Sequence, residues 1–208
     1  MKILVTGFEP FGEHNLNPSQ MLVQTLVDTP FEGINLVKAI LPVDNFKGPE
    51  ILLTHYREHR PDAVLSFGLA SGRARISLER VALNLNDFEI PDNQGILITD
   101  KRIAPDGPTA YFTTLPILSI LSALAVSGIP AEISLTAGTY LCNLVFYTIM
   151  HEVAQSHHFI PAGFVHLPAT PEQAAQTQKP VPSMSLDIMV NSAKIVIQQI
   201  AASLSTSD

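Results

Sequence analysis

The sequence predicts a single α/β domain over residues 1–208, built as a three-layer α/β/α sandwich around a mostly parallel, twisted sheet. Short apolar runs rich in β-branched residues alternate with amphipathic helical patterns, an order typical of doubly wound sheets. The length of 208 residues and the 46% of apolar side chains suit one large core. A break in this alternation predicts an antiparallel excursion around residues 76–98.

Each element follows from its periodicity and from the turn residues that bound it. Unbroken apolar runs predict strands over 2–6, 35–41, 63–67, 132–135 and 163–167. Helical patterns open at Asn17-Pro18-Ser19 and cover 49–59, 114–127, 143–154 and 186–202. Between them, residues 76–86 alternate like a half-exposed strand, 91–95 form a turn, and the proline-rich stretch 168–182 is a surface loop.

Composition narrows the class of partner. The net charge is −7, the pI is about 5.4, and no block of like charges occurs, which argues against nucleic acid or an anionic membrane. The apolar run Ile3–Val5 is too short for a signal-peptide core, and no run has the length of a transmembrane helix. We therefore expect a soluble, cytoplasmic protein, and the high apolar content favours a homo-oligomer, a dimer or a tetramer.

Cys142, the only cysteine, falls at the first turn of a helix, just after a glycine-containing turn. If residues 131–167 form one βαβ unit, that helix begins at the carboxyl edge of the sheet, where the strand carrying His166 also ends. A helix N-terminus and an imidazolium stabilise a thiolate and lower its pKa, and the amides around Leu141 and Cys142 can form an oxyanion hole. The alternative is a buried structural thiol.

Glu79 extends this constellation. In an alternating strand over 76–86 it shares an apolar face, where a carboxylate needs a partner. One interpretation is that Glu79 orients the imidazole of His166, as the acid of a catalytic triad does. The other is a structural ion pair with Arg73, Arg75 or Arg80.

The loop TGFEPFG follows the first strand and places Phe8 and Phe11 beside glycines. It either walls a small apolar pocket or only packs against the core. It lacks the G-x-G-x-x-G pattern of dinucleotide sites. His55 and His59 lack the zincin order, His157-His158 falls in a loop, and Gly68–Gly72 matches G-x-S-x-G only loosely, so we expect no metal site.

A series of motifs, in the order TGFEPFG, NPS, GRARISLERVALN, IPDNQG, DGPTAYFTTLPI, AGTYLCN, GFVHLPATPEQ and PSMSLDIMV, closely resembles the pyroglutamyl-peptidase I (pyrrolidone-carboxylate peptidase) family over nearly the whole chain. The resemblance implies a cysteine peptidase that removes an N-terminal pyroglutamyl residue from peptides without a metal or other cofactor. It implies a triad of Glu79, Cys142 and His166, and often a tetramer. The implied substrate pocket consists of Phe8, Phe11, Asn17, Leu69, Tyr140 and Leu141.

Two positions depart from the relatives. Leu69 stands where they often have Gln, and Glu89 stands where some have Arg, so a basic group near the thiolate is expected to be missing. Two alternatives to the peptidase therefore remain: an inactive relative, and a nucleotide- or nucleoside-binding α/β protein that uses the TGFEPFG loop.

Overall fold

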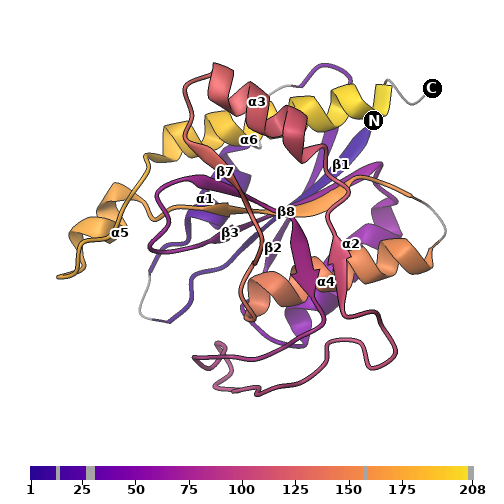
Figure 1. The fold of residues 1–208 in the computed structure, drawn as a ribbon, viewed down its shortest axis with the longest axis vertical. Helices are drawn as coiled ribbons and strands as arrows, with labels where there is room; N and C mark the ends of the chain where they lie inside the picture. The colour runs from indigo at the N-terminus through magenta and orange to yellow at the C-terminus, as the bar shows by residue number, and fades with distance from the viewer. Residues whose placement is uncertain (13–14, 27–30, 157–158, 206–208) are drawn as a thin grey trace.

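The computed structural model describes residues 1–12, 15–26, 31–156 and 159–205. A six-stranded sheet in the order β2-β1-β3-β8-β4-β7 lies between two layers of helices (Figure 1). Its strands are β1 (Lys2–Phe8), β2 (Asn35–Leu41), β3 (Ala63–Leu69), β4 (Ile76–Glu79), β7 (Ala131–Ser134) and β8 (Ala162–Leu167). The helices are α1 (Pro18–Thr25), α2 (Lys47–His59), α3 (Ile117–Val126), α4 (Leu141–Gln155), α5 (Pro171–Ala175) and α6 (Leu186–Ser205). The predicted α/β sandwich is confirmed.

The sheet has an apolar core on each face because side chains alternate along its buried strands. Ile3 and Val5 of β1 pack with α1, α3 and α6, whereas Leu4 between them packs with α2 and α4. Figure 1 shows the same division, with α3 and α6 on one side of the sheet and α2 and α4 on the other. His166 follows Ala162 and Phe164 at alternate positions of β8 and therefore faces the α4 layer.

The last two strands of the sheet reverse its direction. β1, β2, β3 and β8 are parallel, but β4 is antiparallel to β8, and β7 is parallel to β4. β7 therefore runs opposite to β8, and the expected βαβ unit with two parallel strands over 131–167 is wrong. Strand direction is set by pairing between distant segments, which the apolar pattern of a short strand does not encode.

The antiparallel excursion is also divided differently from the prediction. The expected strand over 76–86 breaks at Arg80, so that β4 joins the main sheet and β5 (Val81–Leu83) pairs with β6 (Ala110–Phe112) in a separate two-stranded sheet. The expected turn at 91–95 forms, with Gly95 at φ +77°. The expected loop 168–182 contains the short helix α5. His157 and His158 lie outside the described residues.

Asn143 ties the start of α4 to β5. Its buried side chain accepts a hydrogen bond from the backbone N–H of Leu83 at 2.8 Å. The amide of the same side chain donates to the carbonyls of Leu83 and Leu85, both at 2.9 Å. These three bonds fix the small sheet against the helix turn that carries Cys142.

Asn143→Ala is expected to lower the free energy of unfolding by about 2–4 kcal/mol, because a buried donor or acceptor left unpaired costs ~1–3 kcal/mol. Urea unfolding followed by circular dichroism measures the loss. Asn191→Ala, at an exposed position of α6, is the matched control and is expected to change stability by less than about 0.5 kcal/mol. Equal stability of the two variants would contradict the role given to Asn143.

Candidate active site

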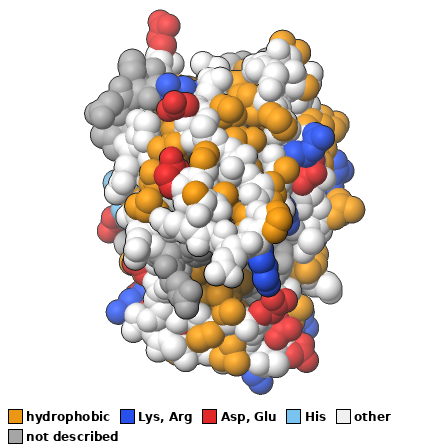
Figure 2. Space-filling model, turned by 90° about the vertical axis from the view of Figure 1, so that its left-hand side faces the viewer, with side chains coloured by type: hydrophobic (Ala, Val, Ile, Leu, Met, Phe, Trp, Pro, Cys, Tyr) orange, Lys and Arg blue, Asp and Glu red, His pale blue; other side chains and the backbone are white. Residues whose placement is uncertain are grey.

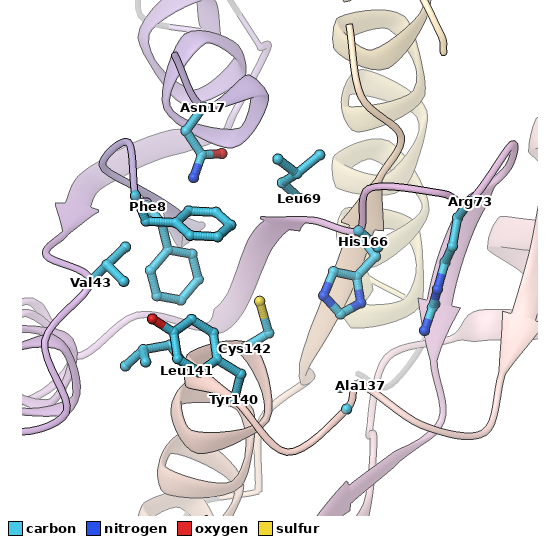
Figure 3. A pocket seen from close by; sticks show the side chains of 13 residues that line it. Phe8, Asn17, Val43, Leu69, Arg73, Ala137, Tyr140, Leu141, Cys142 and His166 are labelled. Atoms are coloured by element: carbon cyan, nitrogen blue, oxygen red, sulfur yellow. The ribbon is translucent and has the colours of Figure 1, made fainter. Parts of the chain in front are cut away.

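Cys142 lies in the first turn of α4 and is held over strand β3 by a glycine. A Cβ atom added at Gly68 would lie 2.9 Å from Sγ of Cys142 and 2.7 Å from the ring of Phe164. Gly68 is also the register partner of His166 in the β3–β8 pair. The strand predicted over 63–67 stops before Gly68, but β3 continues through it, and the missing side chain gives the thiol its place beside the imidazole (Figure 3).

His166 and Glu79 meet because β4 runs antiparallel to β8. Ser77 lies opposite His166, and Glu79, two residues further along β4, therefore points to the same face. Nδ1 of His166 lies 2.7 Å from Oε1 of Glu79, and both side chains are buried. With Glu79 ionised, Nδ1 carries the proton and donates it to this hydrogen bond, which leaves Nε2 as a free acceptor.

Glu79 makes both of the contacts that the sequence offered as alternatives. Nη1 of Arg73 donates to the same Oε1 at 2.6 Å. Nη1 also donates to Oγ of Ser134 at 3.2 Å, and Nη2 donates to the carbonyl of Thr136 at 2.9 Å. Of the three arginines that the sequence offered, Arg73 is the one that forms this ion pair, and it does so without displacing the histidine.

An apolar cavity of about 220 Å³ opens beside the thiol. All six predicted substrate-pocket residues line it together with Cys142 and His166: Phe8, Phe11, Asn17, Leu69, Tyr140 and Leu141. Glu79 lies behind His166 and is not part of the wall. Sequence reasoning missed the wall residues Val43, Ala70, Arg73, Ala137 and Gly138. Figure 3 shows Phe8, Val43 and Tyr140 on one side of Cys142, and His166 and Arg73 on the other.

The TGFEPFG loop both packs against neighbouring segments and forms part of the cavity wall. The backbone N–H of Phe8 donates to Oγ of Ser19, and that of Glu9 donates to the carbonyl of Leu41. These amides are therefore not available to cradle a phosphate, which argues against the nucleotide-binding alternative.

Asn17 is almost fully buried and caps α1. Its Oδ1 accepts hydrogen bonds from the N–H and Oγ of Ser19 at 3.0 and 2.8 Å, and its Nδ2 donates to the carbonyl of Glu9 at 3.0 Å. An Asn amide has two donor hydrogens. One donor of Asn17 is thus left to face the cavity that this side chain lines.

The protonation of the two reactive side chains differs from the expectation. Burial, and then the negative charge of Glu79, raise the pKa of Cys142 to about 12. The helix backbone and the cation Arg73 act in the opposite direction but are outweighed. Burial also lowers the pKa of His166 below its usual value, against the opposing effect of Glu79. At neutral pH the site therefore holds a neutral thiol beside a neutral imidazole, and the expected lowering of the thiol pKa is wrong.

Glu89, the second departure from the relatives, is exposed and lies outside the cavity that contains the thiol. It lines a neighbouring hollow with Asp87 and Ile90. Arg73 contributes a cationic side chain to the wall of the cavity itself, and no other described wall residue is a Lys or an Arg. Leu69, the first departure, is 9% exposed and contributes apolar surface to that wall.

The described part of the chain contains neither a metal-binding cluster nor a membrane-spanning helix. His55 and His59 stack on α2 with their ring centroids 5.6 Å apart, and no group of three or more His, Cys, Asp or Glu residues among the described ones is arranged to hold a metal ion. Within the same residues, no helix is both long and apolar enough to cross a membrane.

The site combines a thiol at the start of a helix with a buried imidazole, both beside an apolar cavity, and with a buried carboxylate behind the imidazole. This is the layout of a cysteine-dependent hydrolase on an α/β sheet. Comparison with known proteins narrows this class. The family model described as pyroglutamyl peptidase matches residues 1–203. The chain belongs to the pyroglutamyl peptidase family.

Individual relatives agree with this assignment. A pyrrolidone-carboxylate peptidase of Thermococcus onnurineus is 45% identical over 95% of this chain and 98% of its own length. One from Aliivibrio fischeri is 42% identical over 96% of this chain and 92% of its own length. The crystal structure of pyroglutamyl peptidase I from Bacillus amyloliquefaciens superposes with a TM-score of 0.92 at 40% identity, covering 96% of this chain and 94% of that one. A mutant pyrrolidone carboxyl peptidase from Pyrococcus furiosus gives a TM-score of 0.95 at 40% identity, covering 98% and 100% of the two chains.

The raised thiol pKa predicts how the free protein reacts with iodoacetamide. The thiolate is the nucleophile, so the alkylation rate should rise steadily with pH from 6 to 10, without the low-pH plateau that a preformed thiolate–imidazolium pair produces. Because Cys142 is the only cysteine, intact mass reports this site alone. A plateau extending below pH 6 would show that the thiol is already ionised.

Proposed function

We propose that the protein hydrolyses the peptide bond after an N-terminal pyroglutamyl (5-oxoproline) residue, with Cys142 as nucleophile, His166 as general base and acid, and Glu79 as the group that orients the histidine. The observation that carries the proposal is the Cys142–His166–Glu79 arrangement beside an apolar cavity, in a chain of the pyroglutamyl peptidase family. The names of the relatives supply the substrate class.

The proposed acylation begins with the neutral thiol. Nε2 of His166 takes the proton of Cys142 while Sγ attacks the carbonyl of the pyroglutamyl residue. The start of α4 has no side-chain cap, so backbone N–H groups of its first turn are available to stabilise the negative charge that develops on the carbonyl oxygen. His166 then protonates the departing amine, and a thioester between Cys142 and the pyroglutamyl group remains.

In the proposed deacylation, His166 removes a proton from water, which attacks the thioester and releases 5-oxoproline together with the free thiol. Glu79 keeps the Nδ1 proton of the imidazole in place throughout. No step requires a cofactor.

The cavity suits the proposed substrate group. A pyroglutamyl ring is small, planar and uncharged, so its transfer into an apolar site requires no counter-charge. Phe8, Phe11 and Tyr140 supply aromatic surface, with the rings of Phe11 and Tyr140 6.2 Å apart. The remaining donor of Asn17 can bind the lactam carbonyl. Among the described residues of this wall there is no carboxylate to pair with a free N-terminal ammonium, which favours the cyclised terminus.

The test is release of aminocoumarin from pyroglutamyl-aminocoumarin, with prolyl-aminocoumarin as the substrate control. The wild-type protein should cleave the first substrate and should discriminate strongly against the second, whose ring carries a charged amine. Cys142→Ala and His166→Ala are expected to lower kcat by a factor of about 10³ or more. Full activity of the Cys142→Ala protein would refute the mechanism, and a correctly folded wild-type protein without turnover would indicate an inactive relative.

Glu79→Gln separates the orienting role from folding. The substitution keeps the size of the side chain but removes its charge, so kcat should fall while circular dichroism and the melting temperature show a folded protein. Unaltered turnover by a folded Glu79→Gln protein would refute the assignment of Glu79.

We also propose that the protein works as a homo-oligomer, a dimer or a tetramer, in the cytoplasm. Large apolar side chains are exposed on the single chain, among them Phe112, Leu118, Val126 and Leu135, and Figure 2 shows hydrophobic side chains spread over one face among charged ones. A reducing compartment keeps a functional thiol from oxidation. Light scattering after gel filtration should give at least twice the 22.6 kDa of one chain, and a monomer would contradict the proposal.

A further inference from the structure

Arg73 lies at the site but has no role in the proposed mechanism of the triad. It follows β3 in a turn where its N–H donates to the carbonyl of Ala70 at 3.1 Å, and Gly72 before it has a φ of +97°. Its side chain is about one quarter exposed at 27%. From this position it reaches the buried Oε1 of Glu79 and also forms part of the cavity wall.

We propose that Arg73 is a positioning residue that sets the protonation state of the Cys142–His166 pair: by sharing Oε1 of Glu79 with the histidine, it balances the charge of the carboxylate and lets the imidazole remain an unprotonated base. This inference rests on the proposed peptidase function and adds to it a residue with a defined role.

The geometry gives the reason. Oε1 has two lone pairs for hydrogen bonding, and Arg73 and His166 occupy both, at 2.6 and 2.7 Å. Oε2 of Glu79 is buried and has no partner among the described residues. Among the described residues, the groups that compensate the buried negative charge of Glu79 therefore both bind to Oε1. A guanidinium is always charged, so it stabilises the carboxylate without a proton from the imidazole.

The charges around His166 can be followed element by element. β4 contributes Glu79, the loop after β3 contributes Arg73, and α4 contributes Cys142 across the cavity, with Tyr140 just before the helix. β3 faces the imidazole with Gly68. Burial is the main cause that lowers the pKa of His166, Glu79 favours the imidazolium, and Arg73 opposes Glu79 and lowers the pKa further. Arg73 also lowers the pKa of the thiol, although burial dominates there.

Loss of Arg73 would change the protonation of His166 and of Cys142 in the same sense. The uncompensated carboxylate would attract a proton to His166, and an imidazolium cannot accept the proton of Cys142. The loss of the cation would also make the thiolate harder to form. Both changes move the reactive state of the pair to higher pH. Arg73 thus supplies a basic group near the thiol, although Glu89 stands where some relatives have Arg.

The test compares Arg73→Met with Arg75→Met, which removes the same charge from the same loop at an exposed position and has no ion pair with Glu79. For each protein, kcat/KM for pyroglutamyl-aminocoumarin is measured from pH 5 to 10. In Arg73→Met the acid limb of the profile is expected to move up by about one pH unit or more. Since one pKa unit is a factor of ten in population, the deficit near neutral pH should be about tenfold and should shrink as the pH rises. Arg75→Met should superpose on the wild type.

An equal loss at every pH, with the acid limb unmoved, would mean that Arg73 only supports the loop and would overturn the proposal. Should Arg73→Met fail to fold by circular dichroism, Arg73→Lys answers the question. It retains the charge, so its acid limb should stay near that of the wild type even if kcat/KM falls, and a large shift in this variant would also overturn the proposal.

The pH dependence of Cys142 alkylation keeps this test separate from the proposed function. Iodoacetamide needs no peptidase activity, and the single cysteine makes the reading unambiguous. In Arg73→Met the alkylation profile should move to higher pH, whereas in Arg75→Met it should not. If pyroglutamyl substrates are not cleaved but this shift appears, the role of Arg73 stands and the peptidase assignment fails. If the profiles of the two variants coincide, the role of Arg73 is refuted whatever the substrate.

Discussion

Oε1 of Glu79 accepts a hydrogen bond from the guanidinium of Arg73 and another from the imidazole of His166, in a place where the carboxylate has no exposed surface. A buried carboxylate is stable only when it is paired and hydrogen-bonded. The ion pair supplies the charge, and the histidine supplies the second bond. The orientation of the imidazole, and hence the direction in which Nε2 faces, depends on this one oxygen.

The reversal of strand direction at β4 makes the shared contact possible. After β3 the chain turns back at once: the N–H of Ala70 bonds to the carbonyl of Leu167, and Gly72 takes a left-handed conformation. The turn holds Arg73 near the end of β8, and the returning strand β4 carries Glu79 along that same strand. Because β4 is antiparallel to β8, the acid, the base and the cation come from segments close together in space, although His166 is 87 residues from Glu79 in the chain.

Much of this arrangement can be predicted from the sequence, for identifiable reasons. The apolar runs are long enough to mark the buried strands, and a lone cysteine after a glycine-containing turn marks the start of α4. Glu79 attracts attention because a carboxylate stands among apolar positions, and the structure confirms that it is buried. The sequence presents the two partners of Glu79 as alternatives because a linear pattern does not show that one oxygen can accept from two donors.

The features that could not be predicted are those set by contacts across the sheet. The direction of β7 and the break at Arg80 depend on which strand pairs with which, and the residues near either position give no signal of it. Cys142 and His166 do line one cavity, but the parallel unit used to predict this does not exist. The sequence pattern marks Gly68 only as the end of a strand. Its role, to leave space for the thiol of Cys142, depends on a contact that only the folded structure shows.

The raised thiol pKa and the apolar cavity have the same cause. Burial that suits an uncharged lactam ring also disfavours a thiolate, so this site cannot hold a preformed ion pair at little cost. In the proposed mechanism the thiol therefore loses its proton only as the bond to the substrate forms, and this requires an imidazole that is still unprotonated at neutral pH. A buried carboxylate beside that imidazole would by itself favour the protonated form. Burial of the imidazole and the guanidinium that shares Oε1 of Glu79 oppose this effect together, so that one site can be apolar enough for the ring and basic enough for the thiol.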